Sequence, residues 1–176
     1  MSRRALEGRI TVSGMFRSGT TLFSRMLGAT GENLVVSDPL VYYFKAYRNL
    51  HLRKLGAQGW HPDEPTCDAF RPRFPAVNAA IAAADLSEAV PADVLAKLRE
   101  DLRLWKGEQH PRLVECLDRI GGASFAELYR SMIDLMVELY GGARTRRAGV
   151  KVSWCEEFLP AMARAFPTMR FVLIVR

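Results

Sequence analysis

Residues 9–28, RITVSGMFRSGTTLFSRMLG, constrain the fold of this chain more than any other stretch. β-Branched residues in segment 10–12 predict a strand, and the apolar spacing that resumes after Thr21 predicts a helix. Gly14 and Gly19 bound the turn between them. A strand, a glycine loop and a helix in this order direct backbone N–H groups and the positive end of the helix dipole toward an anion. The stretch therefore predicts a cradle for a phosphate-like group.

The cradle differs from the P-loop of nucleotide triphosphatases in the position of its cation. Its glycines have P-loop spacing and Thr20-Thr21 opens the helix, but Thr20 stands where those enzymes carry lysine. Arg17, inside the loop, supplies the positive charge instead, and a guanidinium can bind phosphate oxygens in a fork. Arg17 and the two threonines could also act only as a helix cap, but the glycine spacing favours anion binding.

The order of the remaining elements predicts an α/β fold. A strand at 34–37 is followed by a helix that Asp38-Pro39 opens, and the last third reads as a strand at 148–152, a helix at 156–166 and an apolar strand at 171–175. The apolar run suits a central parallel strand that is covered on both faces. We expect one three-layer, P-loop-like domain over residues 1–176, with a central parallel sheet and a helical insertion at about 42–147.

Within the insertion, two segments have clear helical periodicity. The helix from Pro91 to Gly107 places five apolar side chains on one face, namely Val94, Leu95, Leu98, Leu102 and Trp105. The segment from Ser124 to Leu139 begins with a capping box, in which Glu127 is the fourth residue. Residues 58–75 hold four prolines without a sustained period and predict a long irregular loop, 78–84 predicts one or two helical turns, and 112–120 fits no single element.

Each predicted strand brings one candidate residue to the same edge of the sheet. The first strand leads into the Arg17 loop, the second ends at Asp38, the third carries Lys151 and the fourth ends at Arg176. In open parallel sheets the ligand lies outside the carboxyl ends of the strands. Cations and a carboxylate around a glycine loop suit the transfer of a charged group to a nucleophile that must lose a proton. Arg17, Lys151 and Asp38 are the candidate catalytic residues.

Asp38 and Lys151 also have structural interpretations. Asp38 before Pro39 could be the N-cap of the following helix, and capping and proton transfer could both hold. Lys151 could be a lysine that protects an edge strand from aggregation. Its neighbours Val150 and Val152 favour a buried strand instead, where an unpaired ammonium group would be costly.

The composition is that of an ordinary globular chain with a basic surplus. Hydrophobic residues make up 49% of the 176 residues and charged residues 25%, with a net charge of +6. This charge favours an anionic cofactor and, since the basic residues are scattered, argues against nucleic acid. The three cysteines and three histidines lack metal-ligand spacing, which favours reduced thiols and no metal site. No membrane span and no signal peptide are apparent, and we expect a cytoplasmic protein without a membrane partner.

Segment 16–22, FRSGTTL, resembles the signature of sulfotransferases that use 3′-phosphoadenosine 5′-phosphosulfate (PAPS). In that family the loop holds the 5′-phosphosulfate. The resemblance implies this role for the cofactor-binding residues of the loop, which are Arg17, Ser18, Gly19, Thr20 and Thr21.

A second block, residues 151–176, is similar to a later segment of the same family, in which a strand lysine precedes a helix, Phe-Pro and an apolar strand ending in arginine. The resemblance implies that Arg176 binds the 3′-phosphate of the cofactor and that Lys151 assists the sulfuryl group or its leaving oxygen. Tyrosylprotein sulfotransferases carry a glutamate base just after the second strand, and Asp38 holds that position here. Family members continue beyond this arginine, so we expect a fragment that binds the cofactor poorly by itself.

The resemblance implies transfer of a sulfuryl group from PAPS to an acceptor hydroxyl, or less readily to an amine. The acceptor is a small molecule, a sugar or a peptide, and segment 42–116 is expected to shape its site. A divergent P-loop kinase or ATPase is the alternative enzyme, weakened by Thr20 and by the lack of a Walker-B strand. A non-catalytic nucleotide-binding domain is the third possibility.

Overall fold

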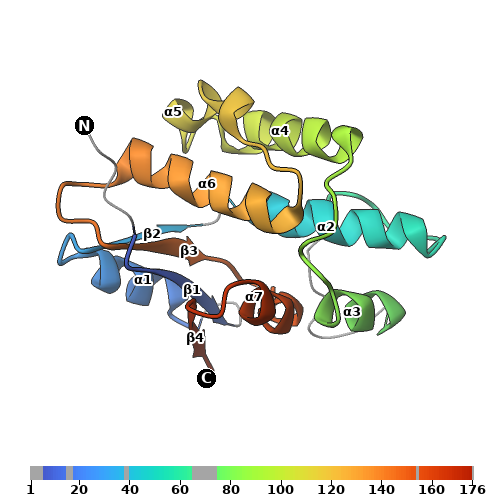
Figure 1. The fold of residues 1–176 in the computed structure, drawn as a ribbon, viewed down its shortest axis with the longest axis horizontal. Coiled ribbons are helices and arrows are strands. Elements are labelled where there is room, and N and C mark those ends of the chain that lie inside the picture. The colour runs from blue at the N-terminus through green and yellow to red at the C-terminus, as the bar shows by residue number, and fades with distance from the viewer. Residues whose placement is uncertain (1–5, 15–17, 38–39, 65–74, 154, 176) are drawn as a thin grey trace.

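The computed structural model describes residues 6–14, 18–37, 40–64, 75–153 and 155–175, which form an α/β arrangement (Figure 1). The four strands are β1 (Gly8–Gly14), β2 (Asn33–Ser37), β3 (Arg147–Lys151) and β4 (Arg170–Ile174). They make one sheet in the order β2-β3-β1-β4, and every neighbouring pair is parallel. This confirms the predicted parallel sheet and the α/β fold class.

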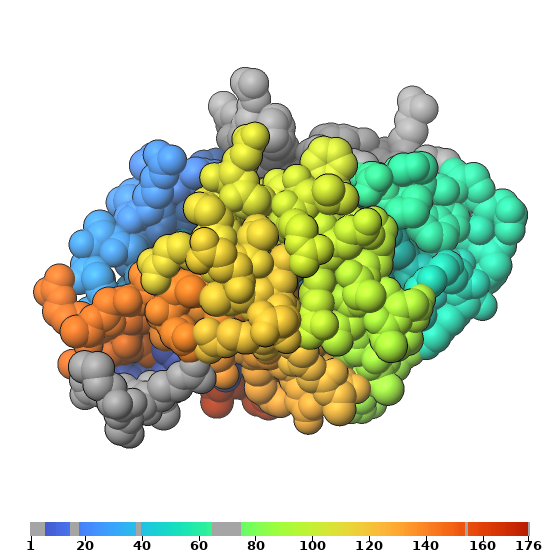
Figure 2. Space-filling model, turned by 90° about the horizontal axis from the view of Figure 1, so that it is seen from above, coloured from blue at the N-terminus to red at the C-terminus, as the bar shows by residue number. Residues whose placement is uncertain are grey.

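Helices cover both faces of the sheet. The helices are α1 (Thr20–Gly28), α2 (Val41–Lys54), α3 (Pro75–Ala82), α4 (Ala92–Lys106), α5 (Pro111–Val114), α6 (Phe125–Tyr140) and α7 (Leu159–Ala165), with short 3₁₀ helices η1 (Leu117–Arg119) and η2 (Glu156–Phe158). In Figure 1, α1 lies below the sheet and α6 above it, and α4 and α5 form a further layer over α6. Seen from above in Figure 2, residues of α4, α5 and the connection to α6 cover the centre of the molecule, with α2 at one side.

The start of α6 confirms the predicted capping box. The Oγ atom of Ser124 accepts a hydrogen bond from the Glu127 backbone N–H at 3.3 Å, and the Glu127 carboxylate accepts one from the Ala123 N–H at 2.8 Å. These bonds satisfy backbone groups that a helix N-terminus leaves without intrahelical partners.

The core of the helical part is an aromatic cluster between α2 and α6. Tyr43 and Tyr47 of α2 and Phe125 of α6 are all fully buried. The Tyr47 and Phe125 rings meet edge to face with centroids 4.7 Å apart, and Tyr43 donates a hydrogen bond from its hydroxyl to the Phe125 carbonyl at 3.1 Å. Leu40 before α2 and the apolar positions Tyr43, Phe44, Tyr47 and Leu50 within it recur at helical spacing, and all five are buried.

Two predictions of detail are wrong. Trp105 is 59% exposed, whereas Val94, Leu98 and Leu102 of the same helix are buried, so the buried face of α4 does not continue into its last turn. The apolar run at 171–175 belongs to β4, which is an edge strand of the described sheet with Leu173 49% exposed, and not to a central strand. Helix α2 begins at Val41 after Leu40, and Asp38-Pro39, which were predicted to open this helix, lie outside the described residues.

The ambiguous and irregular segments are also resolved in part. Segment 112–120 divides between α5 and η1, and the predicted helix at 156–166 is η2 followed by α7, which has a proline in its first turn. Of the predicted loop at 58–75, residues 65–74 lie outside the described residues, and 58–64 form neither helix nor strand. In the described parts of the chain, Cys116 and Cys155 are free thiols, and no helix is long and apolar enough to cross a membrane.

Candidate functional site

The carboxyl ends of the four strands lie side by side at one edge of the sheet. Ser37 of β2 pairs in register with Lys151 of β3, Lys151 with Val12 of β1, and Val12 with Val172 of β4. The chain runs from this row into the glycine loop after β1 and toward α2 after β2. The predicted convergence of the strand ends is therefore confirmed. Of the residues assigned to this edge, Arg17, Asp38 and Arg176 lie outside the described residues.

Lys151 is the last residue of β3 and is only 5% exposed. Because β3 lies between β2 and β1, Lys151 is not on an edge strand, and the edge-strand interpretation of this lysine is wrong. Its neighbours Val150 and Val152 are fully buried, as predicted. A lysine placed among apolar residues at the end of an interior strand brings positive charge to the site edge in a weakly solvated environment.

The glycine loop begins at Gly14, a position with no space for a side chain. Gly14 ends β1, and a Cβ atom added there would overlap the carbonyl oxygen of Ile174 on β4. On the other side of the loop, Gly19 is the N-cap residue of α1 with φ 91° and ψ 8°, a left-handed conformation that glycine adopts readily. Glycine is therefore required at these two positions for different reasons: lack of space for a side chain at Gly14, and a left-handed backbone at Gly19.

Helix α1 begins at Thr20, as predicted. The Gly19 carbonyl accepts the first helical hydrogen bond, from the Phe23 N–H at 3.0 Å. Thr20 is buried and Thr21 is exposed. The first amides of a helix have no acceptor within the helix, and together with the helix dipole they favour an anion.

Ser18 carries a buried hydroxyl group that has no hydrogen-bond partner among the described residues. Its Oγ atom lies 3.0 Å from the position that a Cβ atom on Gly14 would occupy. Leaving a buried hydroxyl unsatisfied costs about 1–3 kcal/mol. The Ser18 Oγ atom next to the α1 N-terminus thus fits an anionic group that accepts a hydrogen bond.

Sequence reasoning missed one carboxylate at this edge. Glu156 of η2 accepts a hydrogen bond through Oε1 from the Ser13 hydroxyl of β1, at 2.9 Å. Ser13 is 1% exposed and directly precedes Gly14. The two residues are 143 positions apart, so no local sequence pattern could have paired them.

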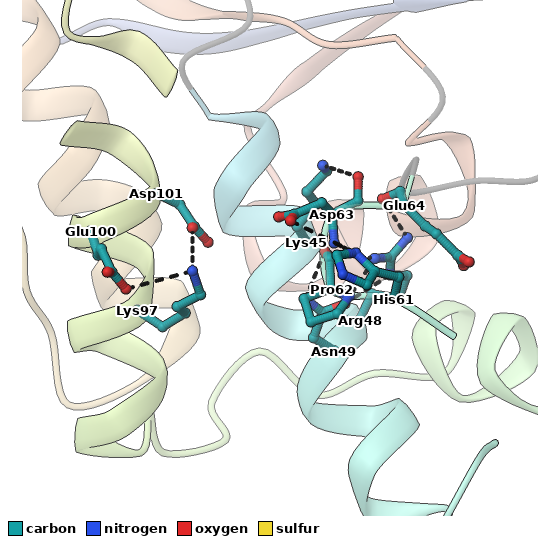
Figure 3. A network of polar contacts seen from close by, with 10 residues as sticks. All are labelled: Lys45, Arg48, Asn49, His61, Pro62, Asp63, Glu64, Lys97, Glu100 and Asp101. Carbon is teal, nitrogen blue, oxygen red and sulfur yellow. Dashed lines mark hydrogen bonds and ion pairs between the residues drawn. The ribbon is translucent and has the colours of Figure 1, made fainter. Parts of the chain in front are cut away.

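On the helical side of the edge, α2 holds the irregular segment 61–64 (Figure 3). The buried Arg48 donates hydrogen bonds to the carbonyl of Glu64 at 2.9 Å and to that of Pro62 at 3.2 Å. Lys45, one turn earlier, donates to the Asp63 carbonyl at 2.8 Å. Partial burial, followed by the nearby charge of Arg48, lowers the pKa of the Lys45 ammonium. Segment 61–64 is therefore fixed to α2 by two cations.

The first turn of α2 carries Tyr42, which lies between this segment and α4. Its ring centroid is 5.4 Å from the Lys45 Nζ atom, a cation–π distance. Burial and then the carboxylates of Asp101 and Asp63 raise the pKa of the Tyr42 hydroxyl. Asp101 belongs to α4 and binds Lys97 at 2.6 Å, so α4 also contributes charge to this side.

Metal-ligand clusters and the environment of His51 can be assessed in the described parts of the chain. No group of three or more histidine, cysteine, aspartate or glutamate residues there could hold a metal ion. His51 stacks on Tyr47 with ring centroids 4.5 Å apart, and its Nε2 atom lies 3.3 Å from Glu88 Oε2. Burial and the neighbouring Lys54 lower the pKa of His51. His51 is part of the contact between α2 and the chain before α4.

Two glycines that flank the loop after β1, the N-terminus of α1 and the buried Lys151 thus lie at the carboxyl edge of a parallel sheet, where open α/β proteins bind their ligands. Comparison with known families makes the class specific: the family model described as "Sulfotransferase family" matches residues 9–176. The chain therefore belongs to the sulfotransferase family. No curated protein and no solved structure matches it.

Proposed function

We propose that this chain transfers a sulfuryl group from PAPS to the hydroxyl group of an acceptor. The observation that carries the proposal is the placement of Lys151 beside the cradle: its register partner Val12 lies two residues before Gly14, where the loop begins. Sulfuryl transfer moves a charged group, and this arrangement directs a cation and helix amides to the same edge. Family membership supports the reaction class.

The cofactor would be held by the cradle. Arg17, Ser18, Gly19, Thr20 and Thr21 are the proposed ligands of its 5′-phosphate, and Arg176 is the proposed ligand of its 3′-phosphate. The unpartnered hydroxyl of Ser18 and the left-handed Gly19 support this assignment, because both suit an anion at the α1 N-terminus. When bound, PAPS supplies the activated sulfuryl group.

Three side chains would serve the transfer itself. The ammonium group of Lys151 stabilises negative charge that develops between the leaving oxygen and the sulfuryl oxygens, and Arg17 adds a second cation from the loop. Asp38 accepts the proton that the acceptor hydroxyl loses as it attacks. Asp38 directly follows Ser37, the register partner of Lys151, which supports its assignment to the same edge.

The acceptor would approach from the helical side. Segment 61–64 is bonded to Lys45 and Arg48 of α2, the helix that follows β2 and carries Tyr42 in its first turn. Both polar and aromatic groups occur there, which suits a small molecule, a sugar or a peptide that carries a hydroxyl group.

Calorimetric titration tests the cofactor assignment. We expect adenosine 3′,5′-bisphosphate to bind measurably, with the low affinity predicted for these residues by themselves, and ATP with magnesium to bind more weakly or not at all. Ser18→Ala should weaken bisphosphate binding about tenfold, the equivalent of one hydrogen bond to a charged group. Ser87→Ala, which removes an exposed hydroxyl bonded to Asp85, is the matched control and should not change the affinity.

The possible outcomes separate the three classes of protein. A preference for ATP would indicate a divergent P-loop kinase and contradict the proposal. Binding of neither nucleotide would also contradict it. Bisphosphate binding without PAPS-dependent transfer to any hydroxyl acceptor would indicate a non-catalytic nucleotide-binding domain.

A further inference from the structure

The exit of the chain from β1 into the cradle is held from two sides. On one side, Gly14 approaches the Ile174 carbonyl of β4 so closely that no side chain fits. On the other side, the Ser13 hydroxyl donates its 2.9 Å hydrogen bond to Glu156 Oε1. Because these two contacts involve consecutive residues, they fix both the position and the direction of the chain as it enters the loop.

The Glu156 contact also connects the cradle to the strand that carries Lys151. Glu156 begins η2, five residues after Lys151, and Val152 between them donates its backbone N–H to the Val12 carbonyl at 2.9 Å. Ser13 follows Val12 directly. The segment after β3 therefore contacts the end of β1 twice, once through the backbone and once through the Glu156 side chain.

A carboxylate so close to an anion cradle is unfavourable for anion binding in itself, because like charges repel. Ser13 explains its presence. The hydroxyl is 1% exposed, where an unsatisfied donor is costly, and a carboxylate oxygen is a strong acceptor for it. The hydrogen bond from Ser13 to Glu156 therefore fixes the end of β1, and this benefit offsets the repulsion between the Glu156 carboxylate and a bound anion.

We infer that Glu156 is a positioning residue of the transfer site: through Ser13 it fixes the entry of the cradle relative to Lys151. This inference rests on the proposed function for its catalytic consequence, but the positioning of the loop does not depend on which anion binds. A preorganised cradle loses less free energy on binding because its donors already point at the ligand.

Two readouts test the inference on the whole chain. The first is hydrogen exchange, without ligand, of the Val152 and Phe23 backbone amides, which donate to the Val12 and Gly19 carbonyls on the two sides of the loop. The second is the calorimetric Kd of adenosine 3′,5′-bisphosphate. Glu156→Ala and Ser13→Ala should each accelerate the exchange and raise the Kd about fivefold to tenfold, the range of one hydrogen bond. Glu156→Gln keeps an oxygen acceptor and removes the charge, so it should bind the bisphosphate at least as tightly as the unchanged protein.

A double variant and an exposed control complete the design. Ser13→Ala combined with Glu156→Ala should show no larger effect than either single change, because both remove the same contact. Glu108→Ala changes an exposed carboxylate beyond the end of α4 and should leave both readouts unchanged. Thermal unfolding of each variant shows whether a change in Kd merely follows a loss of global stability.

The inference is overturned if the Val152 and Phe23 amides of Glu156→Ala exchange like those of the unchanged protein, or if Glu156→Gln loses as much affinity as Glu156→Ala. Failure of the unchanged protein to bind the bisphosphate would contradict the proposed function instead. The exchange measurement would then still decide whether Glu156 positions the loop.

Discussion

The carboxyl edge of the sheet and the helical layer use buried residues in opposite ways. At the edge, the buried residues include Ser13, Thr20 and Lys151, and the backbone is left-handed at Gly19. In the layer of α2, α4 and α6, the buried residues are mainly large and apolar, with aromatic rings in edge-to-face contact. Polar burial and unusual backbone conformations cost stability, whereas apolar packing supplies it.

This difference indicates a division of roles. The edge holds groups that suit anion binding and charge transfer, and its stability depends on the packing of the neighbouring helices. Changes in the helical layer should therefore affect unfolding first, and changes at the edge should affect binding and turnover first.

The largest expected effect is on stability, from Phe125→Ala in the helical layer. Phe125 is fully buried between Tyr43 and Tyr47, and removal of a buried phenylalanine costs about 3–5 kcal/mol of unfolding free energy. Denaturant unfolding measures the loss. Trp105→Ala, at an aromatic residue that is 59% exposed, is the control and should change stability by no more than about 0.5 kcal/mol. A loss at Trp105 as large as that at Phe125 would contradict the assignment of the core.

Lys151→Ala should have the next largest effect, and on turnover. Loss of a preorganised donor to developing charge lowers kcat about 100-fold to 1000-fold. A PAPS-dependent transfer assay measures it, with the bisphosphate Kd as the second readout. Lys106→Ala, at the end of α4, is the matched control. Turnover within about threefold of the unchanged protein, a small change on the free-energy scale, would remove Lys151 from the transfer site.

A smaller effect is expected from Gly19→Ala. The left-handed conformation at φ 91° disfavours any side chain, so the substitution should cost about 1–2 kcal/mol and weaken bisphosphate binding. Gly28→Ala is the matched control within the same helix. Gly28 ends α1 without a positive φ, and alanine there should stabilise the helix by up to about 1 kcal/mol. If Gly19→Ala and Gly28→Ala changed the unfolding temperature in the same direction, the strain assigned to the left-handed backbone at Gly19 would be contradicted.

The smallest effect concerns pH and belongs to the helical layer. Glu88 lies close to His51, but Lys54 also binds this carboxylate, and burial together with the Lys54 charge lowers the pKa of His51 from its ordinary value of 6.5. The folded chain then binds the His51 proton less readily than the unfolded chain. The contribution of neutral His51 to the unfolding free energy should therefore be fully present above about pH 6.5. It should be lost as the pH falls through the lowered pKa.

His51→Gln tests this dependence. In the variant, the decrease of the unfolding free energy between about pH 7 and pH 5 should become less steep, because the titrating group is gone. Thermal unfolding over this range measures the slope. A steeper decrease in the variant would show that His51 is stabilised in its charged form by Glu88.

Much of the fold follows from local patterns in the sequence. The strand positions, the start of α1 at Thr20 and the capped start of α6 depend on spacing, glycines and capping residues, and the structure confirms them. The interior position of Lys151 was predicted from two valines beside it, because only an interior strand buries both.

Other features depend on what packs against an element, and local patterns do not record that. Trp105 continues the apolar spacing of α4 but is 59% exposed, because spacing alone does not show where a helix has a packing partner. The apolar run of β4 has the composition of a central strand, but its position is set by pairing with β1 alone. Glu156 and Ser13 meet only through the sheet. The roles of Arg17, Asp38 and Arg176 stay predictions.

A crystal structure of the protein with adenosine 3′,5′-bisphosphate tests the central claim most directly. The proposal predicts the 5′-phosphate within hydrogen-bond distance of the Ser18 hydroxyl and of the Gly19 to Thr21 amides, on the side of the sheet edge where Lys151 ends β3. A bisphosphate bound elsewhere, with the Ser18 hydroxyl bonded to protein, would contradict the assignment of this edge as the sulfuryl-transfer site.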